Sequence, residues 1–335
     1  MALATITGGG SFTRQNIADL NNNFASLAGG FTPGNIIYCN PAATGVSSQD
    51  GSVDAPYTSL LDAYAAGRNG YNDVIVLVGN GAASGSARLS ANMTWAKDAL
   101  HLVGVSSGVN ISNRSRIAPT SGVTAFTTFF TVSGNGCLFQ NIQWFQGFAT
   151  GVAASICVTV TGGRNLFQDC HIAGMGDDAS AQSTTSRCLK ISGTGENQFV
   201  NCTIGVDTVA RTVANASVEL ASGTPRNDFI GCTFALLTTS ADALCVLGAA
   251  AGCIDRFSLI KDPVIAASLV GGGIAITGFV KLAASAGGYI IIANPISMGV
   301  TTWGYDATTD AQVKIIGPVT PANGALIGLG VTPAA

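Results

Sequence analysis

A six-residue pattern that begins with an aromatic or apolar residue recurs through the middle of this chain. Its copies start at Phe139, Phe167, Phe199 and Phe229, which are 28, 32 and 30 residues apart, and a weaker fifth copy starts at Ile254. Apolar side chains occupy the first, fourth and sixth positions of each copy, with mostly small or polar ones between them. A period of about 20 to 50 residues indicates a solenoid, because one repeat cannot bury its apolar face alone and has to stack on its neighbours.

The repeat is predicted to consist of strands. A second alternating run precedes each six-residue pattern, and stretches rich in Gly, Ser, Thr and Asn separate the two. These runs are 130–132, 158–160, 189–191 and 218–220, and the stretches that follow them begin at 133, 161, 192 and 222. Apolar residues at every second position, bounded by turn formers, are typical of short strands. The sequence therefore predicts an all-β chain that folds as a parallel β-helix, which we favour over a β-sandwich.

The nine cysteines include three that hold the fourth position of successive patterns, Cys170, Cys202 and Cys232. Stacked coils would place these three in one inward column, about 4.8 Å apart. A metal or disulfide ladder is one interpretation. Packing as small buried hydrophobic side chains is the interpretation we favour, because Ile142 and Phe257 hold the same position in the flanking copies.

Composition restricts the partners. Only 10% of the residues are charged, 47% are apolar and the net charge is −3. We expect no nucleic acid as a partner, because phosphate binding requires a basic surface and no Lys/Arg cluster stands out in the sequence. The apolar stretch 264–300 is interrupted by glycines, Lys281 and Asn294-Pro295, so no membrane span and no membrane partner are predicted. A surface so poor in charge favours permanent assembly, and we expect a homo-oligomer, specifically a trimer.

Three regions follow along the chain. Residues 1–34 form a predicted N-terminal arm with a short amphipathic helix over 13–27, whose apolar face carries Ile17, Leu20, Phe24 and Leu27. This helix either caps the solenoid or docks on a partner. Residues 35–262 form the predicted β-helix, including an entrance cap with a helix over 56–66. Residues 263–335 are almost uncharged and form a predicted Gly-rich C-terminal β cap or oligomerisation region.

The entrance region resembles a known class of proteins. The segments 50–64, 72–78 and 100–105 look like the entrance of right-handed β-helix proteins of the pectate-lyase-like class, a fold that tailed-phage virions often use. Together with residues 12–17 and 93–98, they resemble phage structural proteins of the head-decoration kind. The resemblance covers about residues 12–260 for the fold and 12–120 for the virion role. It implies a right-handed parallel β-helix in a virion that is assembled in the host cytoplasm.

Catalytic residues are difficult to identify in this sequence. Glycoside hydrolysis requires two carboxyl groups about 5–10 Å apart. The two glutamates, Glu196 and Glu219, belong to different repeats and different positions within them, and Asp177-Asp178 could pair with Asp207 or lie in a solvated loop. Arg187 and Lys190 flank a strand without an acidic cluster beside them. Each of the two histidines has a plainer assignment, since His101 belongs to a strand and His171 takes an outward position where we expect it to be exposed.

One further motif comparison is negative. The run Gly79–Gly85 has the spacing GxGxxxG and is followed by no amphipathic helix, so it does not fit a dinucleotide loop. We therefore predict no catalytic residues, no metal site and no cofactor.

These observations lead to one functional hypothesis and two alternatives. We expect a virion structural protein without enzyme activity that decorates or cements a phage capsid, with the major capsid protein or another virion protein as its partner. The candidate docking residues are Ile17, Leu20, Phe24 and Leu27. The alternatives are a tailspike that binds or cleaves host surface polysaccharide and a passive receptor-binding fibre.

Overall fold

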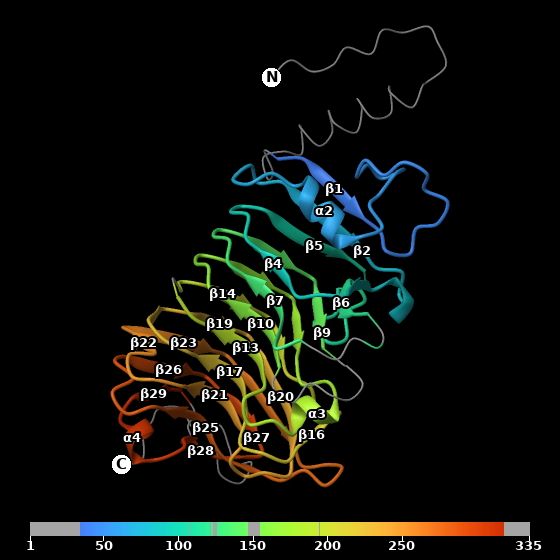
Figure 1. Cartoon of the computed structure of the whole chain (residues 1–335). Coiled ribbons are helices and arrows are strands. Elements are labelled where there is room, and N and C mark those ends of the chain that lie inside the picture. Colours follow the sequence, from blue (N-terminus) through green and yellow to red (C-terminus); the bar gives the residue numbers. More distant parts are fainter. Residues whose placement is uncertain are drawn as a thin grey trace, which may run out of the picture.

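The computed structural model describes residues 34–317, apart from 107, 121, 123–125, 147–154 and 194, and shows a right-handed parallel β-helix (Figure 1). Successive coils stack along one axis, and each coil contributes strands to three sheets, which we call sheets A, B and C. All pairings between their strands are parallel, which confirms the predicted fold class.

Sheet A has ten strands and runs the length of the solenoid. In spatial order, they are β1 (Ile36–Cys39), β2 (Val74–Val78), β5 (His101–Val105), β8 (Leu138–Gln140), β11 (Leu166–Gln168), β14 (Gln198–Val200), β19 (Asp228–Ile230), β23 (Phe257–Lys261), β26 (Tyr289–Ala293) and β29 (Val313–Ile316).

Sheets B and C have one strand per coil in the same way. Sheet B contains β3 (Ala87–Leu89), β6 (Arg116–Pro119), β9 (Gln143–Phe145), β12 (His171–Ala173), β15 (Thr203–Ile204), β20 (Thr233–Thr238), β24 (Val264–Ser268) and β27 (Ile296–Met298), with β16 (Ala210–Arg211) paired to β20. Sheet C contains β4 (Met93–Trp95), β7 (Thr128–Val132), β10 (Ile156–Val160), β13 (Arg187–Ile191), β17 (Ala216–Leu220), β21 (Leu244–Gly248), β25 (Ile276–Leu282) and β28 (Val300–Gly304). A small separate pair joins β18 (Thr224–Pro225) to β22 (Ile254–Asp255).

The first position of the repeat forms one interior column in sheet A. The rings of Phe139, Phe167, Phe199 and Phe229 are buried and nearly parallel, with centroids 4.8, 4.7 and 4.9 Å apart. This column was predicted from the spacing and is confirmed. It continues on both sides through aliphatic residues that pair in register: Ile37, Ile75, Leu102, Ile260, Ile292 and Ile315.

The fifth copy of the pattern was placed wrongly. Phe229 pairs with Ile260, so the fifth copy starts six residues later than the predicted Ile254. Ile254 instead begins the short strand β22 in the turn between sheets C and A. The pattern at Ile254 consists of an apolar residue and a second apolar residue three positions after it. This signal is too weak to distinguish such a turn from a strand. The strands after Pro263 continue the same three sheets, and the oligomerisation role of 263–335 stays a prediction.

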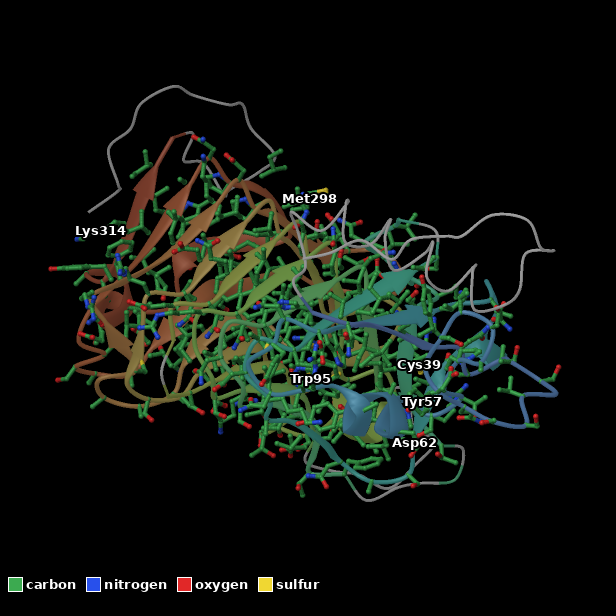
Figure 2. All side chains as sticks on the ribbon, turned by 90° about the horizontal axis from the view of Figure 1, so that it is seen from above. Cys39, Tyr57, Asp62, Trp95, Met298 and Lys314 are labelled. Atoms are coloured by element: carbon green, nitrogen blue, oxygen red, sulfur yellow. The ribbon has the colours of Figure 1, made fainter. Side chains whose placement is uncertain are left out.

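The entrance of the solenoid is covered by a helix. We predicted a helix over 56–66, and the structure has α2 (Leu60–Ala66), whose N-cap Ser59 accepts a hydrogen bond from the Asp62 amide. Leu60 and Ala63 are buried against the first layer of the core. Figure 2 shows Asp62 beside Cys39 and Tyr57 at this end of the molecule, and Lys314 at the other end.

Three short elements complete the described structure: α3 (Asp178–Ala181), α4 (Ala307–Asp310) and the 3₁₀ helix η1 (Ala83–Gly85). None of the described helices, the longest of which has seven residues, could cross a lipid bilayer. The predicted N-terminal helix with Ile17, Leu20, Phe24 and Leu27 lies outside the described residues.

All nine cysteines are buried and free. The thiols of Cys170, Cys202 and Cys232 each lie 3.2–3.4 Å from the carbonyl oxygen of the phenylalanine one coil below. Burial raises the pKa of the Cys202 and Cys232 thiols well above its ordinary value. In the described part of the chain, no group of three or more His, Cys, Asp or Glu side chains could hold a metal ion. The column therefore packs as core.

Candidate functional site

A ladder of buried asparagines shapes the turn that leads from sheet C into sheet A. The amide oxygen of Asn165 accepts from the Cys137 backbone N–H at 2.8 Å, that of Asn197 from Asn165 at 3.0 Å, and that of Asn227 from Asn197 at 3.3 Å. Each asparagine is almost completely buried. These bonds satisfy backbone donors in every coil. They fix the turn so that the residue before each asparagine lies at the outer edge.

Charged residues stand at these outer positions and form an ion-pair ladder along the solenoid axis. Glu196 bridges Arg164 in the coil below and Arg226 in the coil above, with both nitrogen–oxygen distances 3.2 Å. In a chain with 10% charged residues, three alternating charges in consecutive coils are a notable concentration. We call Arg164, Glu196 and Arg226 the axial ladder.

Two members of the axial ladder have unusual backbone conformations. Arg164 has φ = +58° and Glu196 has φ = +57°, whereas Gly136, which holds the equivalent position one coil earlier, has φ = +65°. A side chain in this region costs about 1 kcal/mol relative to glycine. Exposed ion pairs of this kind typically contribute only about 0–1 kcal/mol. Stability alone therefore does not account for long charged side chains at these positions.

A groove of about 320 Å³ lies beside the axial ladder on the outside of sheet A. It is lined by Glu196, Gln198, Arg226, Asp228 and Phe257. Gln198 and Asp228 are partners in register on β14 and β19, with 3.5 Å between the amide nitrogen and a carboxylate oxygen. In Figure 1 these strands, with β22, β23 and β26, reach the same side of the solenoid.

The groove brings together two carboxylates that the sequence does not pair. Glu196 and Asp228 belong to adjacent coils, since Gln198 pairs in register with Asp228 and Glu196 precedes Gln198 by two residues. Glycoside hydrolysis requires a pair of carboxyl groups, one acting as acid and the other as base or nucleophile. The arrangement is chemically able to supply an acid and a base on either side of a bound sugar.

Aromatic rings extend the same face. Phe257 pairs in register with Tyr289 on the next coil, and Tyr289 is 49% exposed. The Lys314 ammonium lies 5.3 Å from the centre of the Tyr289 ring. Flat rings beside hydrogen-bonding side chains suit the apolar faces and hydroxyl groups of sugar rings. The face therefore combines stacking surface with charged groups over consecutive coils.

The acidic residues considered from the sequence lie elsewhere. Asp177 is the N-cap of α3 and accepts from the Ser180 amide at 3.1 Å, so its carboxylate has a local structural role. Asp178 lies in the first turn of that helix, and Asp207 is exposed. The axial ladder was not predicted. A detectable signal existed, because a charged residue directly precedes an asparagine at 164, 196 and 226.

The second glutamate completes a buried ion cluster on sheet C. Glu219 lies 2.8 Å from the Arg187 Nε and 2.9 Å from the Lys190 Nζ. The side chains of Glu219 and Arg187 are about nine-tenths buried. The Arg187 guanidinium also donates to the carbonyl oxygens of Thr184 and Ser186. The acidic partner that the sequence did not reveal for Arg187 and Lys190 is therefore Glu219, and the cluster holds strands β13 and β17 together.

His171 is buried, which corrects the prediction that it is exposed. It does occupy an outward position of sheet B, but the loop between β5 and β6 covers it, and only 4% of the residue is accessible. The Ser112 backbone N–H from that loop donates to Nδ1 at 3.0 Å, while Nε2 lies 2.9 Å from the Gly205 carbonyl oxygen. Nε2 therefore carries the proton. Burial lowers the pKa of His171 from its ordinary value.

Comparisons with known proteins identify the fold only. No protein-family model matches the sequence, and no curated protein matches it. Among solved structures, the chain is similar to pectate lyase Pel9A, with 16% identity and a TM-score of 0.55 over 87% of this chain and 70% of that one. It is also similar to a pectin methylesterase from Yersinia enterocolitica, with 9% identity and a TM-score of 0.49 over 81% and 92%. A third similar structure is pectin methylesterase PemA from Erwinia chrysanthemi, with 15% identity and a TM-score of 0.48 over 81% of this chain and 81% of that one.

The prediction that the chain is not an enzyme is wrong. It is contradicted by the similarity of the chain to pectate lyase Pel9A, which is an enzyme. The prediction rested on carboxylates scattered over the repeats, and coiling the chain brings Glu196 and Asp228 to one groove. Likeness at this level of identity establishes the fold.

Proposed function

We propose that the protein binds an extended polysaccharide along the outer face of sheet A and hydrolyses its glycosidic bonds between Glu196 and Asp228. The observation that supports the proposal is the groove that both carboxylates line, beside the axial ladder and the ring of Phe257. A linear glycan can follow the solenoid axis and contact several coils at once.

Each part of the groove has a role in this proposal. Phe257 and Tyr289 provide stacking surface for sugar rings, and Gln198 and Arg226 donate hydrogen bonds to hydroxyl groups. One carboxyl group protonates the leaving oxygen while the other acts as base or nucleophile, as the two general mechanisms of glycoside hydrolysis require. Arg164 and Arg226 position Glu196 by holding both of its oxygens.

The test is an activity assay on matched variants. The purified protein is incubated with neutral and acidic polysaccharides, and the release of reducing ends is measured together with binding. We expect turnover by the wild type and a loss of about 100-fold or more in Glu196→Gln and in Asp228→Asn, with melting temperatures nearly unchanged because both residues are only partly buried.

Asp54→Asn is the matched control, because Asp54 is exposed in a loop of the entrance region and does not line the groove. Its turnover should equal that of the wild type. Turnover that survives in both groove variants would refute the assignment of the carboxylates. A wild-type protein that neither binds nor cleaves any polysaccharide of the panel would refute the function.

As a second candidate, we propose a virion structural role, such as capsid decoration or a tailspike. The observation that favours assembly is an uncharged, exposed apolar surface along the last strands of sheet B. Leu269, Val270, Ile296 and Met298 are 58%, 81%, 61% and 56% exposed, and Met298 projects at the periphery in Figure 2. Exposed apolar side chains that gather on one surface favour protein contacts.

Electron microscopy with labelled protein tests this second candidate directly. Label on the head of phage particles would support decoration, label on the tail would support a tailspike, and no label on any particle would refute a virion role. Trimer formation stays a prediction, which the mass of the purified protein in solution would test.

A further inference from the structure

Three arginines lie close together at the start of sheet B, and no carboxylate of the described residues pairs with them. Arg88 belongs to β3, Arg116 to β6, and Arg114 precedes Arg116 by two residues. Among the described residues, none of the three takes part in an ion pair. Within the described part of the chain, Arg88 donates only to the carbonyl oxygens of Pro119 and Ala83. The cluster therefore carries positive charge that nothing in the described structure neutralises.

The sequence directly after the strands that carry Arg116 and Gln143 contains no acidic residue. The segments that follow β6 and β9 in the chain, 120–127 and 146–155, contain no Asp or Glu. The negative charge of Asp207 acts to raise the pKa of His171, but Asp207 forms no ion pair with the three arginines. Burial, together with the charges of Arg114 and Arg88, lowers the pKa of Arg116 to about 10. An uncompensated cation in a buried position is costly, which suggests that the native environment includes an anion.

A hydrogen bond from its Nε atom fixes the orientation of the Arg116 guanidinium. Its Nε donates to the Gln143 amide oxygen at 2.6 Å, and the Gln143 amide nitrogen lies 3.0 Å from Nδ1 of His171. Because that histidine nitrogen also accepts from Ser112, it carries no proton, and the Gln143 amide must donate to it. This chain fixes the Gln143 amide with its oxygen towards the arginine. It explains why a buried histidine and a buried glutamine stack outside sheet B.

The outer side of the same guanidinium has no hydrogen-bond partner among the residues that the structure describes. The Phe145 ring lies against the Arg116 guanidinium, 4.7 Å from ring centre to Cζ, and limits its movement. Its two terminal nitrogens donate to no described residue, although the residue is only 9% exposed. Two parallel N–H groups on a fixed plane match the spacing of two oxygens of a carboxylate, phosphate or sulfate group.

We propose that Arg88, Arg114 and Arg116 form a binding site for an oxyanion, in which the terminal nitrogens of Arg116 hold two oxygens of the anion. Gln143 and His171 are positioning residues that orient Arg116 and do not touch the ligand. The anion is either a free ion or an acidic substituent of a saccharide. The site is separate from the groove of Glu196 and Asp228 and does not depend on the activity proposed for it.

Calorimetry and thermal unfolding at constant ionic strength test the site. Inorganic phosphate and sulfate are titrated against chloride into the full-length protein. We expect both oxyanions to bind and to raise the melting temperature, while chloride does not. Arg116→Gln should weaken binding at least 10-fold, and Arg116→Lys should weaken it nearly as much because it keeps the charge but loses the paired donors.

Arg114→Gln provides a variant with little risk to folding, because Arg114 is half-buried and has no partner in the described structure. It should weaken binding about 3-fold to 10-fold. Arg256→Gln is the matched control, since Arg256 is exposed and pairs only with its neighbour Asp255. Equal binding by the wild type, Arg114→Gln and Arg116→Gln, or equal effects of chloride and phosphate, would overturn the proposal.

A further pair of titrations identifies the source of the anion. Oligosaccharides with uronic acid residues are compared with neutral ones of the same length. Tighter binding of the acidic oligosaccharide than of phosphate, lost in Arg116→Gln, assigns the site to a saccharide substituent. Binding of phosphate alone, also lost in Arg116→Gln, assigns it to a free ion.

Discussion

The two glutamates of this chain offer a matched test of how burial changes the value of an ion pair. Each bridges two cations. Glu219 and its partner Arg187 have side chains that are only 10% and 8% exposed, whereas Glu196 pairs with arginines that are 70% and 46% exposed. Replacing Glu219 with alanine leaves Arg187 buried without its carboxylate. Breaking a buried pair by removing one partner costs about 3–5 kcal/mol.

The expected loss for Glu219→Ala lies near the lower end of that range, at about 3 kcal/mol, for two structural reasons. The Lys190 side chain is 31% exposed and can recover hydration, and Arg187 keeps its bonds to the Thr184 and Ser186 carbonyl oxygens. Glu196→Ala should cost no more than about 1 kcal/mol, because exposed pairs contribute little. The same substitution at two sites should therefore differ by about 2 kcal/mol or more.

Urea unfolding followed by circular dichroism measures both variants. The difference between wild type and variant should be large for Glu219→Ala and close to the experimental error for Glu196→Ala. Replacing the whole cluster with apolar residues, as in R187M/K190M/E219M, should be less destabilising than Glu219→Ala, because no unpaired charge remains. The reasoning would be refuted by equal losses in the two alanine variants, or by a loss below 1 kcal/mol for Glu219→Ala.

Two further predictions concern the core and the histidines. Phe199→Ala removes a ring that stacks between Phe167 and Phe229, with centroid distances of 4.7 and 4.9 Å. It should lower the free energy of unfolding by about 3–5 kcal/mol in the same urea assay. A loss below about 1 kcal/mol would contradict the stacked column. His101 and His171 are the two histidines of the chain and both have a lowered pKa caused mainly by burial, so the folded state takes up protons less readily than the unfolded state. Their contribution to stability is present above the ordinary histidine pKa of about 6.5 and is lost as the pH falls below it. The melting temperature should therefore fall between about pH 7 and pH 5, less so in His171→Gln, and equal pH dependence in that variant would show that His171 does not contribute.

Much of the fold could be read from the repeat. The spacing of Phe139, Phe167, Phe199 and Phe229, with Gly- and Asn-rich turns between strands, predicted the parallel β-helix and the stacked rings. These features depend on alternation within one strand and on equivalence between coils, and both are properties of local sequence. The fifth copy was misplaced because its aliphatic residues resemble those of the short strand β22 in the turn before it.

The candidate site could not be read in this way. Glu196 and Asp228 are 32 residues apart in sequence, and only the coiling of the chain makes them neighbours. The same holds for Arg88 beside Arg116, and for the loop from β5 to β6 that buries His171. Alternation determines whether a side chain points into the core or away from it. Which outward side chains become neighbours, and which are covered, depends on the stacking register and on loops from other coils, because contacts outside the core have no periodic signal in the sequence.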